Sequence, residues 1–488
     1  MNTSELKVMQ NVFISKKDNL LQLADILFSN KIEKVIPLSE KLIDWRDIST
    51  AEKLKQFLQT ASPGDDYPDR KKIEGRFLLA MPGAIDPHVH FNTPGFESRE
   101  NFKHGSLAAA FGGVTTIMDM PCTSVPAVTS RENLEIKLDQ IRGKSHVDYA
   151  LWGGISRLGF SPEKDLESDI HRLALAGVIG FKAYFLSGMD TFPDLDFDRM
   201  EFAAIVADEN MRPLAVHAEE RIYVVQRQQR FEMMGRNDWR AYCESRDDLA
   251  EAKAVARLIQ IARDISAKIH VVHLSSKLAL DLIREAQANS VKITAETCPH
   301  YLYFTQENFK DESIAAYLKT APPVKFEVDK EALWQGLRDG AISFVTTDHA
   351  GCNPKKEKSS FNFWEVYGGI PGVEHRVPFL FSEGFKKGRL TLAQTIDLLA
   401  TNAARYFSIS KRKGELSPGK DADMALINLW DGQVVEAGNM HSKGKYTPFE
   451  GVTFSAVVEA TFLRGQCAMD RNGEPEVGLG YGEFIKPE

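Results

Sequence analysis

Eight short apolar segments alternate with longer segments that mix apolar and charged residues, beginning at residue 79. We interpret the short segments as strands, at residues 79–86, 113–119, 147–152, 178–184, 213–217, 269–273, 291–296 and 342–347. The longer segments have the periodicity of amphipathic helices, for example at residues 102–111, 165–176, 197–210, 249–264 and 277–289. Strands that alternate with helices indicate an α/β protein with a parallel sheet, and eight such units favour a closed (β/α)8 TIM barrel. A doubly wound open sheet is the alternative, but no GxGxxG motif follows an early strand to support it.

The two ends of the chain have a different pattern, with short β-like runs and a polar stretch at residues 61–70. We therefore predict a small β-sandwich domain built from residues 1–78 and 416–488, beside a barrel domain at 79–415. Residues 222–250 are rich in charge and interrupt the alternation of strands and helices. For this segment we favour a solvent-exposed helical excursion from the barrel, that is, an insertion, over a lid on the barrel.

Composition excludes several classes of function. The 488 residues carry a formal net charge of −8, whereas nucleic-acid binding needs clustered Lys and Arg to neutralise phosphates. No run reaches the ~18 apolar residues of a membrane helix, and residues 1–7 lack the apolar stretch of a signal peptide. Five scattered cysteines without a CxxC pair indicate neither a disulfide framework nor a cysteine zinc cluster. We expect a cytoplasmic protein that acts on a small molecule, without a nucleic-acid or membrane partner.

Polar residues stand at the carboxyl ends of five predicted strands, the end of a barrel where active sites form. They are His88, His90, Lys182, His217, His273 and Asp348. Because His88 and His90 are two residues apart, an extended strand points both imidazoles to one side, where they can bind one metal ion. A structural role explains any one of these residues alone. Four histidines, a lysine and an aspartate at one end of one barrel predict a metal site.

Lys182 is the unusual member of this set. A free ammonium would repel a metal ion, and it is costly among apolar residues. Burial and nearby cations lower the pKa of a lysine, and the neutral amine can then take up carbon dioxide to form a carbamate. The carbamate is an anion with two oxygens that can bridge two metal ions. The alternative is a lysine paired with a nearby carboxylate.

Short motifs along the predicted barrel are typical of one enzyme family. They read PGAIDPHVH at 82–90, GGVTT at 112–116, DMP at 119–121, GFK at 180–182, ETCPHY at 296–301, TDH at 347–349, GIPGVE at 369–374, TNAA at 401–404 and GKDAD at 419–423. With these motifs the chain resembles the cyclic amidohydrolases, which include allantoinase, dihydroorotase and dihydropyrimidinase (hydantoinase). The resemblance runs from about residue 79 to the end, and residues 8–70 carry no motif of the family.

The resemblance implies two Zn²⁺ ions per subunit, with manganese, iron or cobalt as alternative ions. It places the HxH pair on the more buried metal and His217 with His273 on the more exposed one, bridged by Lys182 as an N6-carboxylysine. Asp348 would bind the buried metal and act as the catalytic residue, moving a proton from a metal-bridging hydroxide to the leaving ring nitrogen. The resemblance also implies a homo-oligomer, either a tetramer or a dimer.

The residues around the predicted site favour allantoin over other rings. Dihydroorotases follow HVH with an arginine that holds the substrate carboxylate, whereas Asn92 stands here, as in allantoinases. Hydantoinases place a tyrosine shortly after the bridging lysine, and residues 185–188 here read FLSG. Against allantoin, Ala350 after Asp-His is a dihydroorotase feature. We expect a hydrolase that converts allantoin to allantoate. A dihydroorotase or dihydropyrimidinase/hydantoinase activity is the alternative, and a non-catalytic assembly relative is less favoured.

Three residues are candidates for substrate binding. The resemblance places main-chain contacts with the ring near Ala321 and Gly368. Asn92 is a third candidate, although an asparagine before Pro94-Gly95 is explained equally well as a residue that stabilises a turn.

Overall fold

Eight parallel strand positions form a closed barrel in the computed structural model, which describes residues 5–59 and 67–488. The strands are β7 (Ala84–His90), β8 (Val114–Asp119), β9 (Asp148–Leu151), β10 (Gly153–Gly154), β11 (Phe181–Tyr184), β12 (Leu214–His217), β13 (Ile269–Val271), β14 (Ile293–Thr297), β15 (Phe344–Val345) and β16 (His349–Ala350). They pair in the orders β16-β7-β8-β9 and β10-β11-β12-β13-β14-β15. Trp152 separates β9 from β10, and residues 346–348 separate β15 from β16, so the two sheets join into one ring. The predicted (β/α)8 TIM barrel is confirmed.

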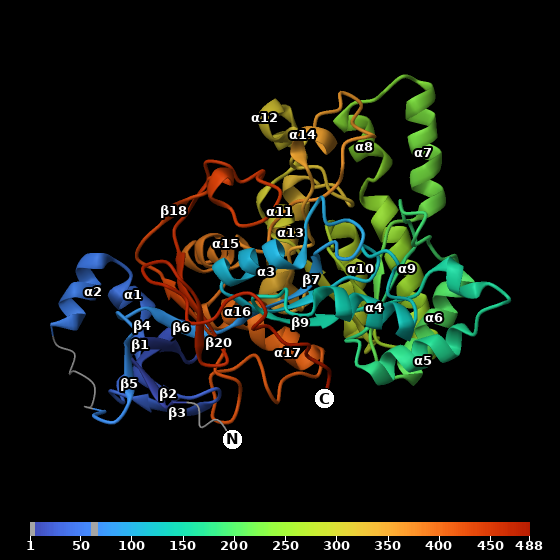
Figure 1. The fold of residues 1–488 in the computed structure, drawn as a ribbon. Coiled ribbons are helices and arrows are strands. Elements are labelled where there is room, and N and C mark those ends of the chain that lie inside the picture. The colour runs from blue at the N-terminus through green and yellow to red at the C-terminus, as the bar shows by residue number, and fades with distance from the viewer. Residues whose placement is uncertain (1–4, 60–66) are drawn as a thin grey trace.

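Helices cover the outside of this barrel (Figure 1). The long ones are α3 (Phe102–Phe111), α4 (Arg131–Ile141), α5 (Leu166–Ala176), α6 (Phe197–Glu209), α9 (Asp248–Ile265), α10 (Lys277–Ala288) and α13 (Glu327–Asp339). Polar N-cap side chains, such as Asn101 before α3 and Ser276 before α10, accept hydrogen bonds from main-chain N–H groups of the first turn. The five predicted helices agree with α3, α5, α6, α9 and α10 to within about one residue at each end.

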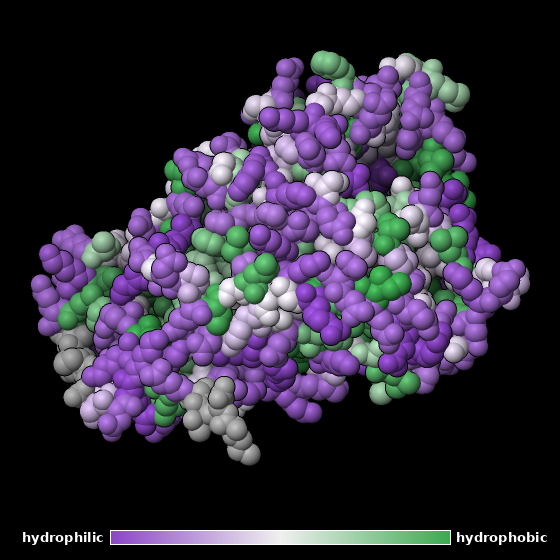
Figure 2. Space-filling model, in the orientation of Figure 1, coloured by the Kyte–Doolittle hydropathy of each residue, from purple (hydrophilic) through white to green (hydrophobic). Residues whose placement is uncertain are grey.

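Shorter helices fill the connections after β14 and β16. They are α11 (Pro299–Tyr303), η2 (Gln306–Lys310), α12 (Glu312–Ala315), α14 (Pro354–Glu357), α15 (Arg376–Phe379), η3 (Leu380–Lys386), α16 (Leu392–Ile396), η4 (Asp397–Thr401) and α17 (Asn402–Tyr406). Within the described ranges, no helix combines the length and apolar character that crossing a bilayer requires. The face drawn in Figure 2 is largely hydrophilic, and its apolar residues lie in small separate groups.

Both ends of the chain contribute to one nine-stranded sheet beside the barrel. Its members are β1 (Lys7–Ser15), β2 (Leu20–Phe28), β3 (Ile32–Pro37), β4 (Ile43–Asp44), β5 (Lys71–Glu74), β6 (Leu79–Pro82), β17 (Met424–Asn428), β20 (Val457–Leu463) and β21 (Gln466–Asp470). Phe28 of β2 and Phe462 of β20 are four strands apart in the pairing order, yet their ring centroids lie 6.3 Å apart. The sheet therefore curls over its own apolar core, as the two layers of a sandwich do.

Smaller elements complete the region of the terminal sheet. They are α1 (Trp45–Ile48), α2 (Ala51–Leu58), β18 (Gln433–Val434), η5 (Ala437–Asn439) and β19 (Thr453–Phe454). Two segments considered in the sequence analysis lie partly outside the described residues. They are most of the polar stretch at 61–70 and the first four residues of 1–7, where a signal peptide was sought.

The strand predicted over residues 79–86 is wrong as a single strand. Leu79–Pro82 is β6, which pairs with β1 and β17 in the terminal sheet, whereas the barrel begins with β7 at Ala84. The apolar run is continuous because both strands are buried, and Gly83 marks the break between them. A Cβ atom at Gly83 would lie 2.2 Å from the Thr115 side chain, so the chain can pass there only without one. The division of the chain at residues 78 and 416 stays a prediction, and the pairing of β6 favours a first boundary at Gly83.

Lys413 stands at the centre of a buried ion network between the barrel and the terminal sheet. Its Nζ atom lies 2.6 Å from carboxylate oxygens of Asp148 and Asp423 and 3.0 Å from Asp421. Arg464, which follows β20, also pairs with Asp148. Although burial opposes the charge, the three carboxylates raise the pKa of Lys413 above its usual value. Protein cations therefore balance these aspartates, and we assign the cluster to the contact between barrel and sheet rather than to a metal ion.

Substitution of Lys413 by Met should lower the free energy of unfolding by about 3–5 kcal/mol, because it leaves buried carboxylates without a cation. Chemical denaturation of both proteins measures the difference. The matched control is Lys277→Met, since Lys277 pairs with Asp281 on an exposed helix surface and should contribute at most about 1 kcal/mol. Equal losses in the two variants would contradict the role of the network.

Candidate metal centre

The six predicted ligands come together at the carboxyl mouth of the barrel. His88 and His90 end β7, Lys182 lies in β11, His217 ends β12, His273 follows β13, and Asp348 lies between β15 and β16. Ring centroids are 5.3 Å apart for His88 and His90, 5.6 Å for His88 and His273, and 4.8 Å for His217 and His273. Parallel pairing brings these residues together, because it places the carboxyl end of every strand at the same edge of the barrel.

The first group of donors is formed by His88, His90 and Asp348. One carboxylate oxygen of Asp348 lies 3.2 Å from Nε2 of His88 and 3.1 Å from Nε2 of His90. Ligand atoms that share one zinc ion lie about 2.0–2.2 Å from it, and so within about 4.4 Å of one another. Both distances from the Asp348 oxygen meet that condition, and all three ligand atoms lie within 4.8 Å of one another. Their chemistry, two imidazoles and a carboxylate, fits a divalent metal ion.

The second group of donors is formed by His217 and His273. Nδ1 of His217 faces Nε2 of His273 at 3.0 Å. Nε2 of His217 lies 2.8 Å from the carboxylate of Glu219, so that nitrogen carries the proton and Nδ1 keeps its lone pair. Two ring nitrogens that face each other across the mouth of the barrel are suited to share a cation.

Buried carboxylates behind the histidines fix which ring nitrogen faces the site. Glu296 lies 2.5 Å from Nδ1 of His88 and 3.1 Å from Nε2 of His270. Although burial acts in the opposite direction, these histidines hold the pKa of Glu296 below its usual range. In the same way, Arg246 and His217 lower the pKa of Glu219 to about 2 against the effect of burial.

Glu219 and Glu296 were not among the predicted site residues, although the sequence holds a signal for each. Glu219 stands two residues after His217, and Glu296 opens the ETCPHY motif. Both carboxylates are ionised acceptors. They complete the pattern of carboxylate, histidine and metal that orients ligands in metalloproteins.

The amine of Lys182 is buried without a partner. Its side chain has no exposed surface, and its Nζ atom makes no hydrogen bond to any described residue. Burial lowers the pKa of Lys182 to about 8. Its nearest aromatic neighbour is Tyr184, whose ring centroid lies 4.5 Å from Nζ. The structure therefore disfavours the alternative of a lysine held by a carboxylate, and a basic amine without a partner fits modification to a carbamate.

A cavity of about 410 Å³ opens above these residues. Ala321 and Gly368 line it together with five of the six predicted ligands, while Lys182 lies beneath its surface. Tyr184, which was not predicted as a site residue, also lines it, with its hydroxyl 3.0 Å from Sγ of Cys122. Lys182 and Tyr184 are two residues apart in β11, so they face the same side of the strand.

Asn92 does not reach this cavity. It is fully buried, it is absent from the lining, and its amide atoms have no described partner. Its φ angle is 55°, and its carbonyl accepts a hydrogen bond from the main-chain N–H of Phe96. The structure therefore favours the turn over the substrate contact, since asparagine tolerates the left-handed conformation.

The segment at 222–250 covers one side of the cavity mouth. Its helices are α7 (Arg221–Met233) and α8 (Trp239–Ser245), which rise above the barrel in Figure 1. In α7, Val224 alone is buried, as expected for a solvated excursion. The same expectation is wrong for α8, because Tyr242 is buried and lines the cavity, as does Arg246 just after the helix.

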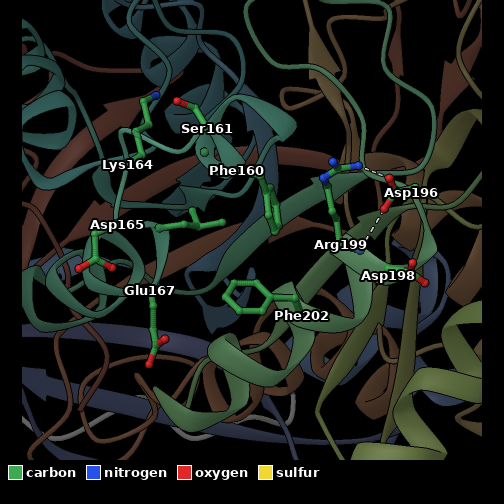
Figure 3. A pocket seen from close by; sticks show the side chains of 11 residues that line it. Phe160, Ser161, Lys164, Asp165, Glu167, Asp196, Asp198, Arg199 and Phe202 are labelled. Atoms are coloured by element: carbon green, nitrogen blue, oxygen red, sulfur yellow. Dashed lines mark hydrogen bonds and ion pairs between the residues drawn. The ribbon is translucent and has the colours of Figure 1, made fainter.

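A larger hollow of about 660 Å³ lies on the outside of the barrel, between η1 (Arg157–Phe160) and the first turns of α5 and α6. Figure 3 shows the rings of Phe160 and Phe202 in it, and Arg199 paired with Asp196. None of the predicted ligands lines this hollow, and its charged side chains are largely exposed. We therefore place the chemistry in the barrel mouth.

Comparisons with known proteins agree with this geometry. Residues 79–468 match the model of the amidohydrolase family. An allantoinase from Rubrobacter xylanophilus is 36% identical over 428 residues, which are 86% of this chain and 90% of that protein. An allantoinase from Saccharomyces cerevisiae is 33% identical over 406 residues, 82% of this chain and 85% of that protein. The solved structure of an L-hydantoinase (dihydropyrimidinase) from Arthrobacter aurescens is similar with a TM-score of 0.86 and 27% identity, covering 98% of this chain and 99% of that one.

Substitution of Glu296 by Gln should weaken metal binding about 10–100-fold, because His88 loses the carboxylate that orients it. Competition with a chelator measures the affinity. The matched control is Glu374→Gln, since Glu374 also contacts a histidine, His441, but does not line the cavity. Unchanged affinity in Glu296→Gln, or an equal loss in the control, would contradict the orienting role.

Proposed function

This chain belongs to the amidohydrolase family, and we propose that it uses two metal ions to open the ring amide of allantoin, giving allantoate. The convergence of four histidines, Lys182 and Asp348 at one barrel mouth carries the proposal of a metal-dependent hydrolase. The allantoinase relatives, which match over most of their length, support the choice of ring.

His88, His90 and Asp348 would hold one metal ion, His217 and His273 would hold the other, and Lys182 would complete the ligand set. When bound, the two cations supply Lewis-acid polarisation of the ring carbonyl and lower the pKa of water. Zinc is the ion we propose, because imidazole and carboxylate ligands suit it. Glu219 and Glu296 keep the histidines in the orientation that this requires.

Lys182 takes part as an N6-carboxylysine. Its amine attacks carbon dioxide, the new N–C bond forms, and the amine loses a proton to solvent, which leaves a carbamate anion. The anion removes the cost of burying a cation beside metal ions. The buried amine without a hydrogen-bond partner supports this assignment.

Asp348 is the proposed catalytic proton carrier. Burial raises the pKa of a carboxyl group, but His88 and His90 hold the pKa of Asp348 well below its usual range, so the group is an ionised carboxylate. Its side chain lines the cavity and is 15% exposed, so it is open to a water molecule and a ring bound there. The proton taken from water is returned to the ring nitrogen as the C–N bond breaks.

The main chain at Ala321 and Gly368 is the proposed holder of the substrate ring. Both residues line the cavity and have little or no side chain, which leaves their peptide groups open to a ligand. A flat ureide presents N–H and C=O groups at its edges. Main-chain donors and acceptors match such groups without adding charge.

The cations in the cavity favour a neutral ring over dihydroorotate. Arg246 faces the carboxylate of Glu219, and Lys319 donates to three main-chain carbonyls. The Lys319 amine and one terminal nitrogen of Arg246 are engaged by protein acceptors, whereas a substrate carboxylate needs a cation that is open to it. Hydantoin and dihydropyrimidine rings remain the alternative, since the similar solved structure is named as a hydantoinase.

We further propose a cytoplasmic homo-oligomer, either a tetramer or a dimer. All five cysteines are free and buried, which suits a reducing compartment. The oligomeric state rests on the resemblance to the family.

Allantoin should be the best substrate when zinc-loaded protein is assayed side by side with allantoin, hydantoin, dihydrouracil and dihydroorotate. Ring opening is measured by the loss of substrate and by the amount of ureido acid formed. Faster turnover of another ring would overturn the choice of substrate and leave the metal-dependent mechanism standing. No turnover of any ring would overturn both.

Substitution of Lys182 by Ala should lower metal content and abolish turnover, because the proposed bridging anion is lost. Short carboxylic acids should partly restore activity by taking the place of the carbamate. Metal analysis and the ring-opening assay measure both effects, with Lys277→Ala on an exposed helix surface as the control. Unchanged metal content and rate in Lys182→Ala would refute the role of Lys182.

A further inference from the structure

Lys319 is a buried lysine whose ammonium group is surrounded by main-chain carbonyls. Its side chain lies in the wall of the cavity, and the residue is 4% exposed. Nζ donates to the carbonyl oxygens of Phe363 at 2.5 Å, Trp364 at 3.1 Å and Val366 at 2.6 Å. An ammonium has three N–H donors, so these three bonds use all of them.

The ammonium of Lys319 also lies between two aromatic rings. Its Nζ atom is 4.6 Å from the ring centroid of Tyr242 and 5.2 Å from that of Phe363. Within residues 5–59 and 67–488, no carboxylate pairs with it. Carbonyl dipoles and ring faces therefore stand in place of a counter-ion, while burial and the nearby cations Arg246 and Lys358 lower the pKa of Lys319 to about 7.

The main chain of Lys319 makes a second connection to the same loop. Its carbonyl accepts a hydrogen bond of 2.9 Å from the main-chain N–H of Gly369. The next carbonyl, that of Thr320, accepts a bond of 2.8 Å from the hydroxyl of Tyr242 in α8. Lys319 thus joins three segments of the cavity wall: residues 319–321, residues 363–369 and α8.

Few main-chain hydrogen bonds form within the loop at 363–369. It contains turns and irregular backbone rather than a helix or strand, yet it supplies five lining residues of the cavity. A loop of this kind is placed by the groups that hold its carbonyls. Lys319 holds three of those carbonyls and one N–H group.

We propose that Lys319 is a positioning residue that fixes the main-chain groups of 319–321 and 363–369 at the separation the substrate ring needs. The proposal rests on the proposed function, because Ala321 and Gly368 lie in these two segments. Lys319 does not touch the reacting atoms, and it acts through the peptide groups on either side of the ring. These contacts act equally on bound substrate and transition state, so the loss of Lys319 weakens binding more than it slows the chemical step.

The test is Lys319→Met, which keeps an unbranched side chain one atom shorter than lysine and removes its three donors. We expect KM for the ring that the wild type opens best to rise about tenfold or more, with kcat within about threefold and metal content unchanged. Hydrogen exchange followed by mass spectrometry should become faster in peptides that cover 319–321 and 363–369. The main-chain N–H of Gly369, which donates to the main-chain carbonyl of residue 319 in both proteins, reports whether the loop keeps its place once the Nζ bonds are lost.

The matched control is Lys386→Met. Lys386 also donates to two main-chain carbonyls, those of Leu429 and Ser455, but it does not line the cavity. It should leave KM and the exchange of both cavity segments as in the wild type. The same changes in both variants would overturn the proposal, as would unchanged KM and exchange in Lys319→Met.

Two further outcomes separate this proposal from the proposed function. If the wild type opens no ring, faster hydrogen exchange in Lys319→Met that is confined to the two segments still supports the positioning role. Unchanged exchange overturns it. If Lys319→Met does not fold, Lys319→Gln keeps two N–H donors and is measured in its place. Loss of metal with a fall in kcat alone would assign Lys319 to the metal centre and overturn the positioning role.

Discussion

Parallel pairing of the barrel strands is the constraint on which the site depends. The registers of β7 with β8, of β11 with β12 and of β12 with β13 carry strand ends that are far apart in sequence to one mouth. At that mouth lie Asp348 and the four histidines, with Lys182 buried below them. Each side chain is placed by its own strand, so the geometry of the site is as rigid as the sheet that carries it.

Burial of so many polar groups is costly unless they have partners, and several of those around the site have one. Glu296 and Glu219 supply partners for His88 and His217, and Arg246 in turn balances Glu219. Buried charges are also paired between the barrel and the terminal sheet, where Lys413 contacts three aspartates. Lys182 departs from this pattern, because its buried amine has no partner among the described residues, and this departure is what points to modification and metal binding.

The barrel and the donors could be predicted because both depend on local patterns. Alternating apolar segments predicted the strands, and His88 and His90 follow from a period of two on an extended strand. The break at Gly83 could not be predicted, since β6 and β7 are both buried and form one apolar run. The role of α8 was missed for another reason: charge along 222–250 describes the exposed surface of α7, whereas the burial of Tyr242 depends on residues 319–364 that pack against it. The sequence left Asn92 open between a turn and a ligand contact because both favour the same residue type, and the structure favours the turn.

Metal stoichiometry tests the central claim most directly, since every role assigned here assumes one binuclear centre. The purified chain, reconstituted with zinc and bicarbonate, should hold about two metal ions per protomer by elemental analysis. Fewer than about one ion per protomer, unchanged by added zinc and bicarbonate, would contradict the account.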